Sequence, residues 1–457
     1  MSVETAETAR TAQTVETAAG VDAGARGTPG VPLSVRAPLR VRLRAALGRA
    51  APALALYAAI RLAGIACLTL WAWHTGRHPR TLLGKSWDSA WYLAIAEHGY
   101  GAPVPKGMWP DAPQADLAFF PLYPWLVRAV SGALPVGGIT AGLLVAWAAA
   151  AVAAWGIFAV GAHLHGRRTG TFLVALWAVL PHAVIQSLGY TETLLTALSA
   201  WSLYGLLTGR PVVAGALAAV AGLARPSALA IVAAVWAAAV AETWRRGRRR
   251  EGKGAPEGGV GAVRGGVEVG KGRVAAYGQP EELPCAGART PPRARLWAGA
   301  LIAPTGWLGY VLWVGQRTGD GPRGYFAVQA LWGSRFDFGQ DALRSVKRLV
   351  LHDVPLAHHM TVAVVCVALL LFLLLALDRP PPALLAYTAV LVVIALGGTD
   401  YFASKPRFLL PAFPLLLPAA VALARARTRT VVLTGGALTA LSLTYGLYLL
   451  TVARMPL

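Results

Sequence analysis

The sequence predicts an all-α protein that crosses a membrane many times. Of its 457 residues, 56% are apolar and only 14% are charged, whereas a soluble protein carries about 25% charged residues. The apolar residues come in blocks of roughly 15–25, and a helix needs about 20 residues to cross the hydrocarbon core. These observations exclude a soluble enzyme, a disordered protein and an outer-membrane β-barrel.

Eleven apolar segments are the predicted membrane helices. This number places the N-terminus inside and the C-terminus outside. The segment 119–134 is not among them, because Pro121 and Pro124 interrupt it, and we expect it to be interfacial or re-entrant. The eleven lie near residues 51–73, 137–162, 171–189, 190–207, 212–224, 226–243, 297–315, 360–377, 384–397, 406–424 and 431–452.

Pro226 decides how the segment 211–243 is interpreted. One long helix would place the basic loop that follows it outside the cell. A proline, however, disfavours helical geometry at the residue before it, which here is Arg225. We therefore expect two short helices, with Arg225 between them at their outer end.

Basic residues are concentrated in segments that can all lie on one side of the membrane. The net charge is +3 over residues 1–50 and +7 over 243–296, but 0 over 74–118 and +2 over 316–359. Under the positive-inside rule, the first two segments are cytoplasmic. The formal net charge of +21 therefore reflects topology, and nucleic acid is excluded as a partner.

Arginine outnumbers lysine 36 to 6, which is typical of a GC-rich bacterial genome. We accordingly expect a multi-pass protein of the bacterial plasma membrane with a cytoplasmic N-terminus. The predicted organisation has four parts. They are a disordered basic tail (1–50), an N-terminal membrane region (51–242) with a catalytic outer loop (74–136), a flexible basic cytoplasmic loop (243–296), and a C-terminal membrane region (297–457).

The first outer loop carries the most informative motif. A helix over 87–98 would align Trp87, Trp91 and Ile95, which predicts an amphipathic helix lying in the membrane interface. Ser86 is a candidate N-cap. Asp88 would lie near the helix start, at the membrane surface. It is either a carboxylate favoured there by the helix dipole or a functional acid.

Other charged residues map to the same predicted outer face. Glu192, in the sequence Tyr190-Thr-Glu192, is an acid at membrane depth, where such groups are functional hypotheses by default, although a helix-cap role is the alternative. Arg225 and the cations of Lys405-Pro-Arg407 lie at helix ends, where snorkelling to headgroups is the alternative. An acid beside several cations at this boundary suits a charged lipid headgroup. The histidines have no metal-ligand spacing, so the sequence identifies no metal site.

Five strings together resemble the PIG-V-type mannosyltransferases, which add the second mannose to glycosylphosphatidylinositol in eukaryotes and have bacterial relatives. Ser86 stands where the family usually has arginine, and Lys85 lies one residue earlier. The five strings are Trp-Asp-x-x-Trp-Tyr-x-x-Ile-Ala-x-x-Gly-Tyr (87–100), Ala-Phe-Phe-Pro-Leu-Tyr-Pro (118–124), Tyr-Thr-Glu (190–192), Gly-Leu-Ala-Arg-Pro-Ser (222–227) and Lys-Pro-Arg-Phe-x-Leu-Pro (405–411).

The resemblance implies a GT-C-type glycosyltransferase fold, a polyprenyl-phosphate mannose co-substrate and an active site on the non-cytoplasmic face, with inversion at the sugar. Asp88 would be the catalytic acid/base, and Glu192 is the second candidate catalytic acid. The acceptor, a lipid or a glycan, and any requirement for a divalent metal stay open. The candidate substrate-binding residues are Lys85, Trp87, Tyr92, Tyr123, Tyr190, Arg225, Lys405 and Arg407.

Two alternatives belong to other functional classes. A transporter or flippase for a lipid or solute would use the same acids and cations as a gate. It predicts charges near the bilayer midplane and repeated halves, whereas here the acids concentrate in predicted outer loops and no fixed-period repeat is present. A non-catalytic membrane scaffold would present the loops 74–118 and 316–359.

The predicted topology is testable by cysteine labelling. A cysteine that replaces Gly107 should react with a membrane-impermeant maleimide in intact cells. A cysteine that replaces Gly259 should react only after lysis, because the basic loop is expected to be cytoplasmic. The reverse pattern would place the candidate site on the cytoplasmic side.

Overall fold

The computed structural model describes residues 38–103, 110, 112, 114–251, 291–399 and 402–453. The described residues from Leu47 onward form one compact unit. The predicted disordered tail (1–50) and flexible loop (243–296) are wrong where the structure describes them. Residues 39–50 belong to the helix Leu39–His74, and residues 243–251 and 293–296 belong to the helices Leu229–Glu251 and Arg293–Ile302, because the leucines, alanines and arginines there are strong helix formers. The rest of both predictions, over 1–37 and 252–290, lies outside the described residues.

The described residues form eighteen α-helices, and the β-structure among them is one isolated antiparallel bridge between Phe336 and Gly398. The first nine helices are α1 (Leu39–His74), α2 (Pro79–Gly84), α3 (Asp88–His98), α4 (Leu122–Ala133), α5 (Gly138–His165), α6 (Arg167–Ala178), α7 (Glu192–Leu207), α8 (Pro211–Ala221) and α9 (Leu229–Glu251). The second nine are α10 (Arg293–Ile302), α11 (Thr305–Thr318), α12 (Gly324–Leu331), α13 (Gln340–Leu351), α14 (Leu356–Leu377), α15 (Pro382–Gly397), α16 (Lys405–Phe408), α17 (Leu417–Arg425) and α18 (Thr428–Thr451).

Six of the described helical segments are long and apolar enough to cross a membrane, and a bent pair, 402–408 with 413–425, makes seven at most. The protein is therefore a multi-pass membrane protein. Helices occupy all eleven predicted segments, but the number eleven is not confirmed. The physical reason is length, because α8 and α15 are apolar yet only 11 and 16 residues long.

Proline breaks the chain where the sequence predicts. Arg225, before Pro226, has extended backbone geometry with φ −161° and ψ 155°. It separates α8 from the short 3₁₀ turn 226–228 and α9. The segment 119–134 contains α4, whose 12 residues begin directly after Pro121. At about 1.5 Å per residue, α4 is too short to cross the hydrocarbon core.

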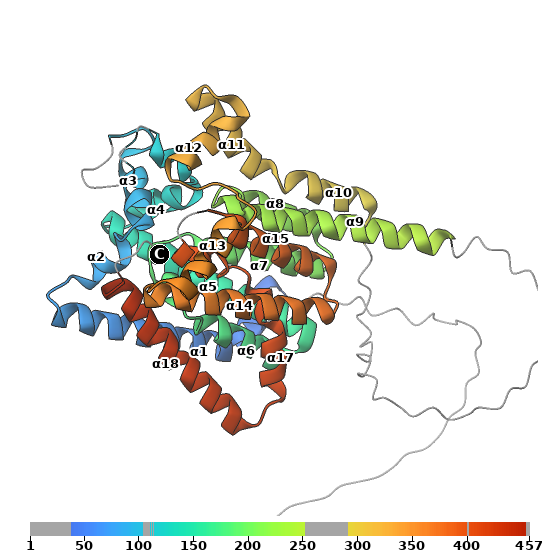
Figure 1. Cartoon of the computed structure of the whole chain (residues 1–457). Coiled ribbons are helices and arrows are strands. Elements are labelled where there is room, and N and C mark those ends of the chain that lie inside the picture. The colour runs from blue at the N-terminus through green and yellow to red at the C-terminus, as the bar shows by residue number, and fades with distance from the viewer. Residues whose placement is uncertain are drawn as a thin grey trace, which may run out of the picture. The chain divides into compact units, whose positions relative to one another are not determined.

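Small residues let the central helices pack closely. α5 packs on α6 and α7, and α8 packs on α7, α9 and α10; α8, α9 and α10 run alongside one another in Figure 1. A Cβ atom added to Gly215 of α8 would collide with the backbone of Gly299 of α10. In a membrane, where apolar burial does not drive helices together, such close backbone approach provides the packing energy.

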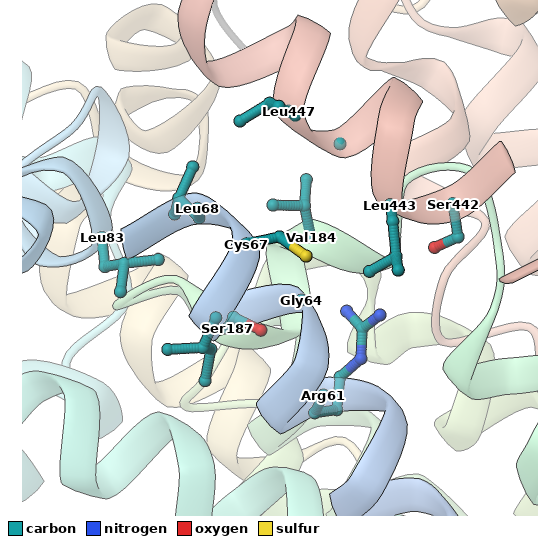
Figure 2. Close-up of a pocket in the computed structure, with 12 residues that line it drawn as sticks. Arg61, Gly64, Cys67, Leu68, Leu83, Val184, Ser187, Ser442, Leu443 and Leu447 are labelled. Carbon is teal, nitrogen blue, oxygen red and sulfur yellow. The ribbon is translucent and has the colours of Figure 1, made fainter. Parts of the chain in front are cut away.

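A buried arginine supports the segment between α6 and α7, which leaves the α-helical form and contains the short 3₁₀ helix 183–187. Arg61 of α1 is 7% exposed, and its Nη1 donates to the carbonyl oxygen of Ala183 over 2.5 Å. Figure 2 shows its side chain between α1, the segment with Val184, and the helix of Leu443. Inside a membrane, a backbone carbonyl without an α-helical hydrogen bond needs another donor. Arg61 supplies that donor to Ala183 and so helps to hold the segment that leads to Tyr190.

The first loop differs from expectation. α3 begins at Asp88, one residue later than predicted, and the stripe expected to face lipid is buried in the protein, because Trp91 and Ile95 are 5% and 4% exposed. Trp91 and Tyr92 pack on the ring of Phe119 instead. The predicted N-cap is also wrong. The Oγ atom of Ser86 donates to the Leu82 carbonyl, and the residue at the cap is Trp87.

Candidate active site

A cavity of about 1600 Å³ lies where α3, the turn after Arg225 and α16 meet. Aromatic side chains from several elements line much of it, among them Trp87, Trp307 and Trp332. The charged residues among its described lining are five cations and one acid. They are Lys85, Asp88, Arg225, Arg335, Lys405 and Arg407. A cavity with this charge favours an anionic ligand.

Arg407 joins the two candidate acids. Its Nη2 lies 2.5 Å from Oδ2 of Asp88, and its Nε lies 3.0 Å from Oε1 of Glu192. Both acids are the first residues of helices, α3 and α7 respectively, where the helix dipole favours negative charge. The N-cap residues are Trp87 and Thr191, and both carboxylates instead form ion pairs with arginine.

Arg225 approaches Glu192 from the other side. Its Nη1 lies 2.6 Å from Oε1 of Glu192 and also donates to Oγ1 of Thr191 over 3.0 Å. The hydroxyls of Thr191 and Tyr92 are 3.1 Å apart. Burial raises the pKa of the Tyr92 phenol to about 12, so the hydroxyl keeps its proton and sustains this contact. The extended backbone at Arg225 therefore places its guanidinium so that Nη1 contacts two acceptor oxygens, one on Glu192 and one on Thr191.

The two acids differ sharply in exposure. The Asp88 side chain is 22% exposed and lines the cavity, whereas the Glu192 side chain is 1% exposed and is not part of the lining. Glu192 lies behind the two arginines, which are themselves 8–10% exposed. Ligands in the cavity therefore meet Asp88, Arg225 and Arg407 first, and Glu192 acts on them through the arginines.

Aromatic rings pack on the guanidinium groups. Arg407 lies over the ring of Tyr190 with 5.1 Å to its centroid, and Phe408 lies near both Arg407 (5.3 Å) and Arg225 (5.8 Å). Cation–π contacts of this kind are stronger where water is excluded. Tyr123 does not contact the guanidinium groups directly. Its hydroxyl donates to the Gly142 carbonyl, and its ring packs edge-on against Tyr92.

The remaining predicted cations lie apart from this cluster. Lys405 is 1% exposed, and its Nζ donates to the carbonyl oxygens of Ala395, Leu396 and Gly398 at 2.7–3.4 Å. It thus satisfies the last carbonyls of α15, although it also lines the cavity. Lys85 is exposed at the cavity wall, beside Trp87, which has a positive φ of 46°.

Several residues of the site have no clear signal in the sequence. Thr191 is fully buried and links Tyr92 to Arg225, but a single threonine before an acid is common. Arg335 and Trp332 enter from the loop after α12, far from every motif. Trp332 donates its indole N–H to the Ala115 carbonyl and meets the edges of Trp91 and Phe119. Among the described residues, no three metal-ligating side chains are grouped.

Comparison with solved structures adds to this picture. The chain resembles the crystal structure of ArnT from Cupriavidus metallidurans bound to undecaprenyl phosphate, with a TM-score of 0.50 and 14% sequence identity over 84% of this chain and 63% of the ArnT chain. The apo ArnT structure is also similar, with a TM-score of 0.45, 14% identity and coverage of 74% and 55%. The chain thus spans less than two thirds of the ArnT chain. No family model and no curated protein matches the sequence.

These observations define the class of protein. The chain is an all-α polytopic membrane protein with a GT-C-type fold, the fold of ArnT, as the sequence predicts. At 14% identity the likeness concerns the fold alone.

The burial of Glu192 leads to a stability prediction. Glu192→Gln removes the charge that compensates two buried guanidinium groups. Breaking a buried pair in this way costs about 3–5 kcal/mol of unfolding free energy, so the midpoint of thermal unfolding of the purified protein should fall clearly. Glu242→Gln is the matched control, since Glu242 pairs with Arg245 and Arg246 on a helix surface, and such pairs contribute less than about 1 kcal/mol. Equal midpoints for the two variants would show that Glu192 does not compensate the charge of Arg225 and Arg407.

Proposed function

We propose that this protein is an integral membrane glycosyltransferase that moves mannose from a polyprenyl-phosphate donor to a lipid or glycan acceptor on the non-cytoplasmic face. The observation that carries the proposal is the cluster of Asp88, Arg225 and Arg407 at the wall of one large cavity. The cluster offers a reachable carboxylate beside two fixed guanidinium groups. This is the pairing that transfer of a sugar from a phosphate requires.

The donor class follows from charge and fold together. Two arginines held by a buried acid form a rigid binding site for phosphate, because the planar guanidinium matches phosphate oxygens. ArnT, whose fold this chain shares, was crystallised with undecaprenyl phosphate. Both facts support a polyprenyl phosphate as the leaving group, with its lipid chain in the membrane and its sugar among the aromatic side chains of the cavity.

The proposed reaction is a single displacement. The oxygen of the acceptor hydroxyl attacks the anomeric carbon, and the glycosidic C–O bond forms as the bond between that carbon and the phosphate oxygen breaks. The phosphate leaves with the electron pair, and its growing charge is stabilised by Arg225 and Arg407. Asp88 accepts the hydroxyl proton. The anomeric centre inverts, so a β-linked phosphomannose gives an α-mannoside.

Glu192 has a different task in this scheme from the catalytic role that the sequence suggested. Its carboxylate is sealed behind Arg225 and Arg407 and contacts both. We assign it as a positioning residue that keeps the two guanidinium groups oriented and supplies the charge that permits their burial. Lys405 is also a positioning residue, since its Nζ donates to the Gly398 carbonyl at the end of α15, at the cavity wall.

Mannose is proposed from the resemblance to PIG-V-type mannosyltransferases. The residues that carry this resemblance, Asp88, Tyr190, Glu192, Arg225 and Arg407, come from four separate strings and form one connected cluster. Their contact supports a common function for the strings. The sugar itself is tested by the assay below.

A direct assay separates transfer from transport. Purified protein in detergent, given polyprenyl-phosphate mannose and a mixture of candidate lipid acceptors, should release polyprenyl phosphate and form a mannosylated product. Detergent abolishes any transmembrane gradient, so turnover there excludes a flippase as the explanation. Polyprenyl-phosphate glucose is the control for the sugar. Transfer of glucose but not mannose would keep the glycosyltransferase and reject the mannosyl specificity.

Asp88 provides the sharpest test of the mechanism. Asp88→Asn fills nearly the same volume but cannot accept the proton, so turnover should fall by roughly 10²–10⁴-fold, as for a removed general base. Asp88→Glu should also be poor, since a carboxylate misplaced by about 1 Å can cost ~10²-fold. Rates come from initial velocities of folded protein. Near-normal transfer by folded Asp88→Asn protein would falsify the catalytic role.

Arg225 tests the phosphate contact. Arg225→Ala should strongly lower transfer, and Arg225→Lys should recover only part, because lysine lacks the planar fork. Both rates are measured against saturating donor. Arg168→Ala, an exposed cation at the start of α6, is the control and should leave transfer unchanged. Wild-type rates in Arg225→Ala would show that the guanidinium does not act on the donor.

A further inference from the structure

Helix α13 has an apolar side that no other described part of the protein covers. Leu343, Val346 and Val350 recur at i, i+3 and i+7, so they form one stripe along the helix. Their side chains are 72%, 42% and 77% exposed, respectively. The side that faces the protein carries Ser345, which is 5% exposed and lies about 200° around the helix from Leu343, with the half-buried Ala342 and Leu349 beside it. The helix is thus amphipathic with its apolar side turned outward.

Basic residues lie along one side of this stripe. Arg344, Lys347 and Arg348 are all exposed, and Asp341 is the one acid within the helix. The start of α13 is fixed by Asp337, whose carboxylate accepts the backbone N–H groups of Gly339 and Asp341 at 2.9 and 2.6 Å. The orientation of the helix is therefore anchored at its first turn.

The apolar stripe continues into a surface that faces lipid. Leu351 and Leu356 are 59% and 53% exposed, and α14 begins at Leu356. α14 is one of the spanning helices, and only 17% of its most apolar stretch is buried within the protein. The exposed side of α13 therefore adjoins side chains that contact acyl chains.

The length of α13 decides how it can meet the membrane. Its 12 residues extend about 18 Å, which is too short for a hydrocarbon core of about 30 Å. Three cations along its length also exclude burial across the core. A short helix with an apolar stripe and a basic side lies along the interface, with the stripe in the acyl region.

We propose that α13 is a membrane-surface anchor whose stripe of Leu343, Val346 and Val350 enters the lipid and whose Arg344, Lys347 and Arg348 bind anionic lipid headgroups. The site is separate from the Asp88 cluster and does not rest on the proposed function. It reaches the cavity through the loop before α13, where Asp337 donates its backbone N–H to the Gly397 carbonyl and Phe336 lines the cavity. The anchor thereby holds one wall of the cavity at the membrane surface.

Site-directed spin labelling tests the placement of the stripe. The background is the full-length protein with Cys67, Cys285 and Cys366 changed to Ser. Single cysteines then replace Leu343, Val346 or Val350 and carry the nitroxide. Each labelled protein is placed in phosphatidylcholine vesicles that contain phosphatidylglycerol. Nitroxides there should be more accessible to oxygen than to a water-soluble nickel chelate, as at the lipid-facing control Leu370. The control Asp320, in an exposed turn, should show the opposite. Accessibility like that of Asp320, or protection from both reagents as under a protein partner, would overturn the anchor.

Headgroup preference is tested in the same vesicles. A fluorophore at position 350 should be quenched several-fold more by brominated phosphatidylglycerol than by brominated phosphatidylcholine, because each cation near the surface attracts anionic lipid. Arg344→Gln, Lys347→Gln and Arg348→Gln together should bring the ratio close to one. Arg167→Gln with Arg168→Gln, two exposed cations at another helix end, should leave it unchanged. Equal quenching by the two lipids in the parent protein would reject headgroup binding.

Discussion

The compensation of charge by Glu192 is the constraint on which the site depends. A carboxylate that is 1% exposed is unstable in a membrane protein unless cations neutralise it. Two arginines do so, one from the break between α8 and α9 and one from α16. Arg407 extends the pairing to Asp88 on α3. Segments that are far apart in the chain are thereby held at one wall of the cavity.

Interrupted helices make this arrangement possible. A continuous helix through Arg225 would satisfy its own backbone, whereas the extended residue before Pro226 lets the guanidinium point to Glu192 and Thr191. Each interruption leaves backbone carbonyls without helical partners, and buried cations supply hydrogen bonds. Lys405 does this at the end of α15 and Arg61 at Ala183. Buried cations in this protein therefore serve either charge pairing or backbone satisfaction.

The unequal burial of the two acids divides their work in the proposed reaction. Asp88 is partly exposed and can meet a substrate, and Glu192 is sealed and can only act on its arginine partners. A site of this design keeps its phosphate-binding groups rigid while its base stays accessible. Preorganised charge of this kind stabilises a leaving group without reorganisation during the reaction. The surface helix α13 adds a membrane contact near the same cavity.

The sequence by itself determined the all-α membrane class, the break at Pro226 and the residues of the cluster, because apolar block length, proline geometry and isolated charges at membrane depth are local signals. It also suggested their shared location, because all of these charged residues map to the predicted outer face. Only the tertiary structure decided that Trp91 and Ile95 are buried instead of interfacial, and that Lys405 supports a helix end. It also decided that Glu192 lies behind the arginines and that Thr191 and Arg335 join the site. The physical reason is that a residue's partners across the bundle determine its burial and its contacts, and spacing along one helix carries no information about them.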